Sequence, residues 1–365
     1  MKLVLATPLY PPEIGGPATY AKELVEGLPA RGIEVELVKF SDVRNLPKLL
    51  RHYRYYRHVL AAARDGDIVF VQDTVSCGLP ARLAAWRAGK PLIVRVPGDY
   101  VWEQARQRFG VADGIDEFQG KQYGLRVGVL RFIQRGVVRS AARVIVPSEY
   151  FAGVAAGWGV PRARIAVIYN GIHLPLTAVP PREVPEAPFM VSVGRLVPWK
   201  GFAALIRILA TLPAWRLVII GDGPNRAALE QEARAAGVAD RVRFVGALPN
   251  AEAVGWYRAA TAFVLNSSFE SFSFQVAEAM AVGARIIATD IGSIPELVED
   301  GQEGLLIRPD DEAAIAASLE LIRTEPAAAA ARAEAAREKA RRFSSERTFD
   351  ALATLLGEVA AAMLR

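Results

Sequence analysis

Twelve short apolar runs alternate with helix-compatible segments along this chain of 365 residues, and this alternation limits the possible folds more than any other feature. Alternation of strand-like and helical patterns is typical of parallel sheets whose strands are joined by crossover helices. Because 365 residues exceed the usual size of one domain, two such sheets are expected. The sequence therefore predicts an α/β protein with two doubly wound, Rossmann-like domains.

The predicted strands fall into two sets of six. Those of the first set are Lys2–Ala6, Glu34–Lys39, Asp67–Val71, Pro91–Val96, Arg143–Val146 and Ile165–Ile168. Those of the second set are Phe189–Val193, Arg216–Ile220, Val242–Val245, Ala262–Leu265, Arg285–Ala288 and Gly304–Ile307.

Residues 174–188 separate the two sets and contain five prolines, which is the composition of a linker. We expect an N-terminal domain of residues 1–173, a C-terminal domain of residues 189–345, and a last helix, 346–365, that packs back towards the N-terminal domain. Because such sheets bind ligands at the carboxyl ends of their strands, we expect the site in a cleft across which the two domains face each other.

Residues 263–283 carry the first candidate site. A strand of Phe263–Leu265 is followed by a turn, by Ser273 as a plausible N-cap, and by a helix that ends near Gly283. Glu270 lies in the turn and Glu278 in the helix. A helix N-terminus attracts anions, and carboxylates accept hydrogen bonds from hydroxyl groups. One carboxylate on each side of an anion site suits a molecule with hydroxyl groups at both ends and phosphate in the middle. A nucleotide-diphosphate sugar has this shape.

The alternative is that both glutamates are solvated surface charges. Glu278 lies within Val-Ala-Glu-Ala-Met-Ala-Val, however, where an apolar helix face leaves few solvated positions. A semi-buried charge needs a partner.

Two loops that follow predicted strands contain glycines and cations. Gly15 and Gly16 follow the first strand and would allow a phosphate to approach the backbone closely, although glycine loops are mostly simple turns. Arg195 and Lys200 follow the first strand of the second set, where two cations can neutralise a leaving diphosphate; the alternative is two ordinary surface cations. The turn at residues 221–224 either lines a nucleotide base or is only a turn.

Composition narrows the class of protein. A single cysteine, Cys77, forms no internal disulfide and fits a reducing cytoplasm. No apolar run reaches the roughly 18 residues of a spanning helix. The net charge of +5 is uneven, since residues 1–172 hold 24 Lys and Arg against 15 Asp and Glu, whereas the remainder holds 20 against 24. The first half is therefore expected to meet an anionic surface or substrate.

Taken in order, these motifs resemble the retaining, GT-B fold glycosyltransferases of family 4 (glycosyl transferases group 1). The resemblance is specific from Phe189 to Pro309, which includes Ala288-Thr-Asp-Ile-Gly-Ser-Ile-Pro-Glu. It is looser in the first half, where it covers the glycine loop, residues 143–150 and residues 168–172. It implies metal-independent transfer of a sugar, with retention, from a UDP- or GDP-type nucleotide sugar to a hydroxyl group, with no cofactor.

The resemblance also implies roles for individual residues. Arg195 and Lys200 match the cations that bind the diphosphate, Glu278 the acceptor of the ribose hydroxyl groups, and Glu270 the carboxylate beside the donor sugar. Backbone groups are implied at the remaining donor-binding positions, which are Gly15, Gly16, Gly194, Gly221, Asp222, Gly223, Ser271, Phe272, Ser273 and Phe274. No metal site is expected, and Asp65-Gly-Asp67 is interpreted as a turn.

The chain departs from the family pattern after the fourth strand, where many members carry a histidine near the reacting sugar. Here the segment reads Val94-Arg-Val-Pro-Gly-Asp-Tyr. Asp99 is the candidate substitute, to orient the sugar or assist proton transfer. The alternative is that Asp99 only caps a helix after Gly98.

Two basic, aromatic segments, residues 45–60 and 124–139, suit an anionic membrane surface on which a lipid-linked acceptor would lie. The alternative is that their cations merely flank packed helix faces. No nucleic-acid motif accompanies them, so nucleic acid is not expected as a partner. We expect a cytoplasmic enzyme, associated with the inner face of the membrane, that acts on a lipid-linked or polysaccharide precursor of the cell envelope. The alternatives are a nucleotide-sugar epimerase and a catalytically silent, nucleotide-sugar-binding subunit.

Overall fold

The computed structural model describes residues 1–13, 16–186 and 188–363, and the chain divides into two compact units. The first unit is Met1–Tyr169 together with Glu346–Arg365, and the second is Asn170–Ser345. Among the described residues, no helix combines the length and the hydropathy required to cross a membrane.

The first unit contains a parallel sheet in the order β2-β1-β3-β4-β5-β6. Its strands are β1 (Lys2–Thr7), β2 (Glu34–Lys39), β3 (Ile68–Val71), β4 (Leu92–Arg95), β5 (Arg143–Val146) and β6 (Ile165–Val167). Its helices are α1 (Gly16–Gly27), α2 (Lys48–Asp65), α3 (Gly78–Ala88), α4 (Tyr100–Phe109), α5 (Ile115–Gly120), α6 (Gly124–Ser140), α7 (Glu149–Gly157) and α15 (Ser345–Met363).

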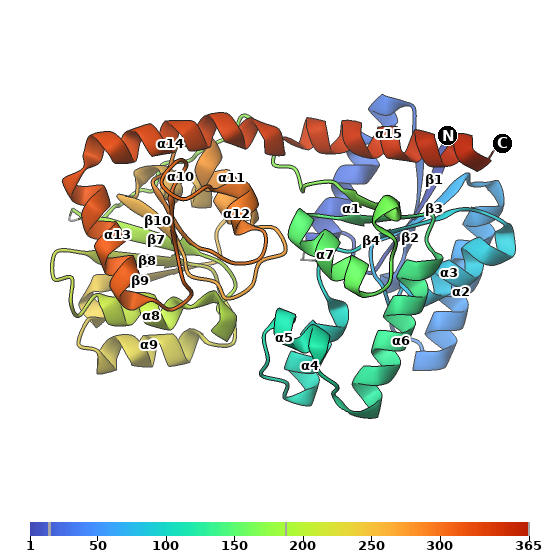
Figure 1. Ribbon diagram of the computed structural model, residues 1–365, viewed down its shortest axis with the longest axis horizontal. Helices are drawn as coiled ribbons and strands as arrows, with labels where there is room; N and C mark the ends of the chain where they lie inside the picture. Colours follow the sequence, from blue (N-terminus) through green and yellow to red (C-terminus); the bar gives the residue numbers. More distant parts are fainter. Residues whose placement is uncertain (14–15, 187, 364–365) are drawn as a thin grey trace. The chain divides into compact units, whose positions relative to one another are not determined.

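Helices cover both faces of this sheet. Leu24 of α1 and Leu352 and Leu356 of α15 are fully buried against strand residues such as Leu5 and Phe70. On the other face α3 packs between α2 and α6 (Figure 1). The apolar face of α15 therefore packs into the core of the first unit, although α15 follows the second unit in the chain.

The second unit contains a parallel sheet in the order β12-β11-β10-β7-β8-β9. Its strands are β7 (Phe189–Val193), β8 (Arg216–Ile220), β9 (Val242–Gly246), β10 (Ala262–Leu265), β11 (Ile286–Thr289) and β12 (Leu305–Ile307). Its helices are α8 (Phe202–Ile208), α9 (Arg226–Ala235), α10 (Asn250–Ala259), α11 (Phe274–Ala281), α12 (Ile294–Leu297), α13 (Glu312–Thr324) and α14 (Pro326–Ala340).

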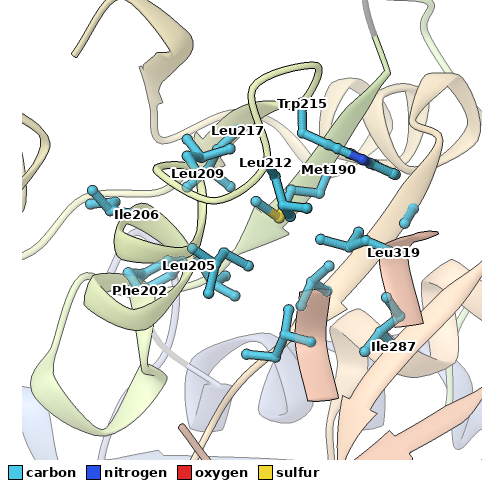
Figure 2. Close-up of a cluster of buried hydrophobic side chains, with 14 of the residues drawn as sticks. Met190, Phe202, Leu205, Ile206, Leu209, Leu212, Trp215, Leu217, Ile287 and Leu319 are labelled. Atoms are coloured by element: carbon cyan, nitrogen blue, oxygen red, sulfur yellow. The ribbon is translucent and has the colours of Figure 1, made fainter. Parts of the chain in front are cut away.

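One face of this sheet packs against α8, α9 and α13. Figure 2 shows the centre of that core, where Met190 and Leu217 of the strands meet Leu205 of α8 and Leu319 of α13. Trp215 is fully buried, and its indole N–H donates to a carboxylate of α13. Helices α10 and α11 lie on the other face (Figure 1). Burial of both faces explains why the strands of this unit are almost continuously apolar.

The prediction of two doubly wound parallel sheets is confirmed. Each predicted strand is present, and the differences are confined to strand ends. The first strand continues to Thr7, for example, and β11 is shifted one residue towards the C-terminus. Such ends are decided by hydrogen bonds to the neighbouring strand, which hydrophobicity does not record.

Candidate functional site

In the second unit the chain reverses its direction across the sheet between β7 and β10. From β7 the sheet continues through β8 to β9, and from β10 it continues through β11 to β12. The loops after β7 and β10 leave the carboxyl edge on either side of this switch point, where open α/β sheets bind ligands. Arg195 and Lys200 lie in the first loop and Glu270 in the second.

The two loops are joined by an ion pair. Lys200 Nζ donates a hydrogen bond to Glu270 Oε1, and the two side chains are only 14% and 9% exposed. Charges this far removed from water depend strongly on each other. The family resemblance implies separate roles for these two residues, whereas the structure brings them into contact.

The position of Lys200 is fixed by the glycine that follows it. Gly201 has φ +64°, and a Cβ there would collide with the main-chain oxygen of Asn266. Asn266 Nδ2 donates to the Gly201 carbonyl at 3.0 Å, and the Ser268 N–H donates to the Trp199 carbonyl at 2.8 Å. The loop of Lys200 is therefore held directly against the loop of Glu270. Asn266 was not predicted as a site residue. The one feature in the sequence that points to it is its position as a polar residue directly after an apolar strand.

The main chain of Glu270 is held from its other side by the turn after β11. Gly292 has φ +52°, and a Cβ there would collide with the Glu270 carbonyl oxygen. That oxygen accepts a hydrogen bond from the Ser293 N–H at 3.2 Å. In the sequence, residues 291–293 stand out only as part of the segment 288–296 that resembles the family. The structure shows that they contact and hydrogen-bond the main chain of Glu270.

Arg195 is exposed on the loop after β7. The glycine before it, Gly194, has φ +156°. Gly221, at the end of β8, has φ +131° and lies so close that a Cβ there would collide with the Gly194 carbonyl oxygen. These two glycines thus allow the loops after β7 and β8 to touch.

The turn at residues 221–224 packs tightly as well. Gly223 leaves no room for a Cβ beside the main chain of Leu196. The Leu196 N–H donates to the Asp222 carbonyl at 3.0 Å, and the exposed Asp222 carboxylate accepts from the Gly223 N–H at 2.7 Å. The sequence leaves open whether residues 221–224 line a nucleotide base or form only a turn. The structure shows a turn that packs against the loop of Arg195. Contact with a base remains a prediction.

Helix α11 begins where the sequence predicts. Ser273 is the N-cap, and its hydroxyl oxygen accepts from the Val276 N–H at 3.3 Å. Phe272 and Ser273 are buried, and Ser271 and Phe274 are partly buried. Because the first turn of an α-helix has N–H groups without intrahelical partners, this segment is suited to bind an anion, as implied for these four residues.

Glu278 lies on α11 and is half-buried. Its carboxylate accepts hydrogen bonds from Asn250 Nδ2 at 2.7 Å and from the Tyr257 hydroxyl at 3.4 Å, both on α10. Burial raises the pKa of Glu278 to about 7, although these two hydrogen bonds oppose the shift. A semi-buried charge was expected to have a partner, and Glu278 has two, the neutral side chains of Asn250 and Tyr257. No local sequence pattern identifies either of them.

In the first unit, Gly15 lies outside the described residues. Gly16 begins α1 and is exposed, and no atom lies within 4 Å of the position that a Cβ would occupy. The switch point of this sheet lies between β1 and β3. The loop that leads to Gly16 leaves the carboxyl end of β1 and belongs to this point.

Asp99 is the N-cap of α4 and is 1% exposed. Its Oδ1 accepts from the N–H groups of Val101 at 3.0 Å and Trp102 at 3.2 Å, and from Gln134 Nε2 at 3.0 Å. Its Oδ2 accepts from Gln119 Nε2 at 2.9 Å. The structure therefore shows the capping role that the sequence left as the alternative, through Oδ1. A role for Asp99 beside the sugar stays a prediction.

No group of three or more His, Cys, Asp or Glu side chains in the described part of the chain is arranged to hold a metal ion. Asp65 ends α2, and Asp67 Oδ2 accepts a hydrogen bond from the Lys2 N–H at 2.7 Å. The Asp65-Gly-Asp67 segment is thus the turn between α2 and β3.

Two protein-family models match this chain, one in each half. Residues 14–175 match Glycosyltransferase Family 4, and residues 179–341 match Glycosyl transferases group 1. The second match contains Arg195, Lys200, Glu270 and Glu278.

Curated relatives match between about half and nearly all of this chain at low identity. The glycogen synthase of Mycobacterium tuberculosis is 29% identical over 397 residues, which cover 98% of this chain and 94% of that protein. The D-inositol 3-phosphate glycosyltransferase of Mycolicibacterium smegmatis is 33% identical over 60% of this chain and 53% of its own length. The lipopolysaccharide core biosynthesis mannosyltransferase LpsB of Rhizobium meliloti is 34% identical over 47% of this chain and 52% of its own length.

Solved structures share the fold. Sucrose-phosphate synthase from Thermosynechococcus elongatus superposes with a TM-score of 0.80 at 21% identity and covers 99% of both chains. HepE from Anabaena in complex with UDP superposes with a TM-score of 0.79 at 20% identity and covers 98% of this chain and 100% of its own.

Proposed function

We propose, from the premise that this chain is a glycosyltransferase with the GT-B fold, that it transfers a sugar from a UDP- or GDP-type nucleotide sugar to a hydroxyl group with retention of configuration. The observation that carries the proposal is the largely buried Lys200–Glu270 pair at the switch point of the second sheet, followed on α11 by Glu278. A nucleotide sugar offers each of these groups a partner.

In this proposal Lys200 and Arg195 bind the diphosphate and stabilise the negative charge that grows on it as the sugar leaves. Preorganised cations that act on developing charge commonly contribute several kcal/mol to transition-state stabilisation. Lys200 has three N–H donors, so it can bind a phosphate oxygen while it still contacts Glu270. These two cations supply the charge that a divalent metal would otherwise provide, and no metal or cofactor is required.

Glu278 accepts hydrogen bonds from the ribose hydroxyl groups of the donor. An ionised carboxylate has about four acceptor positions, and Asn250 and Tyr257 use two of them. Glu270 in turn accepts from hydroxyl groups of the sugar. The N–H groups at the start of α11 bind sugar and phosphate oxygens.

The acceptor is a lipid-linked or polysaccharide precursor of the cell envelope, and the reaction takes place in the cytoplasm. The name of one relative, the mannosyltransferase of lipopolysaccharide core biosynthesis, supports a cell-envelope acceptor, and that of the glycogen synthase supports a polysaccharide acceptor. Retention follows from the resemblance to family 4.

The test is release of nucleoside diphosphate from UDP- and GDP-sugars, measured with and without a panel of lipid-linked and oligosaccharide acceptors. We expect release that depends on an acceptor, and a product whose anomeric configuration, read by NMR, matches that of the donor. Conversion of the donor to another nucleotide sugar without an acceptor would instead identify an epimerase. Binding without turnover for every donor–acceptor pair would identify a silent binding subunit.

A further inference from the structure

Helices α2, α3 and α6 of the first unit carry large apolar side chains that are unusually exposed to solvent. Leu49 of α2 is 90% exposed, Trp86 of α3 is 78% exposed, and Leu125 and Phe132 of α6 are 83% and 81% exposed. Single exposed apolar residues are ordinary, but a connected group of them marks an interaction site. The three helices pack side by side, with α3 in contact with both α2 and α6 (Figure 1).

The exposed residues of α2 and α3 line common hollows, and those of α6 share one face of that helix. A hollow of about 550 Å³ is lined by Leu49 and Tyr53 of α2, Leu83 and Trp86 of α3, and Ile133 of α6. Leu83 and Trp86 also border a second hollow, of about 730 Å³, on the same unit. Along α6, Leu125, Val129 and Phe132 are all exposed at a spacing of three and four residues, which places them on one face. We call this surface the α2–α3–α6 face.

The charge on these helices is almost entirely of one sign. All of their residues are described, and together they carry eleven Lys and Arg side chains but a single carboxylate, Asp65. Arg54, Arg87 and Arg126, one from each helix, are exposed. Exposed apolar side chains on helices whose charges are almost all positive fit a partner that is apolar within and anionic at its surface.

We propose that the α2–α3–α6 face docks on the surface of an anionic lipid bilayer. Trp86, Leu125 and Phe132 would enter the boundary between head groups and acyl chains, and the arginines would meet the anionic head groups. A second copy of the chain fits less well, because two such faces would bring the exposed arginines of one copy against those of the other. Nucleic acid would attract the cations but would gain little from leucine and valine. The inference goes beyond the proposed function and does not rest on it.

The experiment is flotation of the full-length protein with vesicles in the absence of any nucleotide. Vesicles of phosphatidylglycerol and phosphatidylcholine are compared with vesicles of phosphatidylcholine alone. We expect the protein to float with the anionic vesicles only, and the bound fraction to fall as salt is raised, because head-group attraction is screened.

Two variants separate the apolar and the charged contributions. The first combines Trp86→Ser, Leu125→Ser and Phe132→Ser, and the second combines Arg54→Glu, Arg87→Glu and Arg126→Glu. Because the second variant removes three attractive charges and replaces them with repulsive ones, it should lower the partition coefficient by at least about 100-fold. The first should reduce it comparably by removing buried apolar area.

A matched control carries the same charge change elsewhere. Arg234→Glu, Arg258→Glu and Arg342→Glu alter three exposed arginines of the second unit and should leave flotation unchanged. Thermal unfolding verifies that each variant is folded, and nucleoside diphosphate release with a soluble acceptor shows whether the transferase proposal holds separately. Equal flotation by the control and the charge variant, or no binding of the wild type to anionic vesicles, would overturn the inference. So would a lipid-free dimer that the first variant dissociates, since the occupant would then be a second copy.

Discussion

Lys200 and Glu270 have two functions in this account. They stabilise each other at a site that is largely closed to water, and they are the charges that the proposed reaction uses. Removing one partner of such a pair leaves the other charge buried and uncompensated, which costs stability whatever the residue does in catalysis. A useful substitution must therefore separate the two effects.

Lys200→Ala should lower both stability and turnover. We expect a loss of about 1–3 kcal/mol of unfolding free energy, because Glu270 loses its partner, and a fall in turnover of about 100-fold, because the leaving diphosphate loses a cation. The double variant Lys200→Met with Glu270→Gln removes both charges and should recover most of the stability but none of the turnover. Recovery of turnover in the double variant would remove the pair from catalysis.

Glu278 should make stability depend on pH. Its pKa in the folded protein is raised by burial to about 7 from an ordinary value of 4.5. Between these values the folded protein retains a proton that the unfolded chain has released, so the free energy of unfolding falls as pH rises through this window. Urea unfolding at pH 5 and pH 7 should show the wild type losing on the order of 1–2 kcal/mol more than Glu278→Gln. If the wild type and Glu278→Gln lost the same free energy of unfolding between pH 5 and pH 7, the pKa of Glu278 would not be raised.

The charged side chains of the candidate site could be predicted from the sequence, but their surroundings could not. Glu278 stood out because a charge within an apolar helix face is unusual. Its partners, Asn250 and Tyr257, lie 28 and 21 residues away on α10, and neither belongs to a local pattern. The contact between Lys200 and Glu270 spans 70 residues and depends on how two loops pack.

At the scale of the element, glycines hold the loops of the second sheet together. Gly201, Gly221 and Gly292 each have positive φ, and each leaves no space for a Cβ beside the main chain of a neighbouring loop. These glycines are therefore required by contact as well as by conformation. These contacts hold the loops of the candidate site against one another.

Gly292→Ala should displace Glu270, because the new methyl group would occupy the position of its carbonyl oxygen. We expect a loss of at least about 2 kcal/mol of unfolding free energy together with a clear fall in turnover. Gly301→Ala is the matched control, since Gly301 has φ +75° but has nothing within 4 Å of its Cβ position. It should cost only about 1 kcal/mol and leave turnover unchanged. Equal effects of the two substitutions on turnover would show that contact with Glu270 is unimportant.

Helix boundaries could be predicted where one residue decides them. Ser273 caps α11, and Gly283 follows its end with φ +69°, as their residue types indicate. Asp99 was harder, because a carboxylate after a strand suits both a cap and a catalytic group. The amides of Gln119 and Gln134 also donate to Asp99 from α5 and α6, and no local pattern reveals them.

At the scale of the whole molecule, the alternation of strands and helices was sufficient to predict both sheets. The destination of the last helix was a weaker inference, because an amphipathic pattern shows that a helix has a buried face but not which core it joins. Phe349, Leu352 and Leu356 contribute to the core of the first unit. Only that packing reveals where α15 belongs.

The central claim is that the carboxyl edge of the second sheet binds a nucleoside diphosphate through Lys200 and Glu278. Calorimetric titration of UDP and GDP into the wild type, Glu278→Ala and Glu252→Ala tests it most directly. Glu252 is an exposed residue of α10, so its removal controls for the loss of one negative charge.

We expect one of the two nucleotides to bind the wild type and Glu252→Ala with equal affinity. Glu278→Ala should bind it about 10- to 100-fold more weakly, because the ribose hydroxyl groups lose a charged acceptor. Unchanged affinity in Glu278→Ala, or no binding of either nucleotide to the wild type, would contradict the claim.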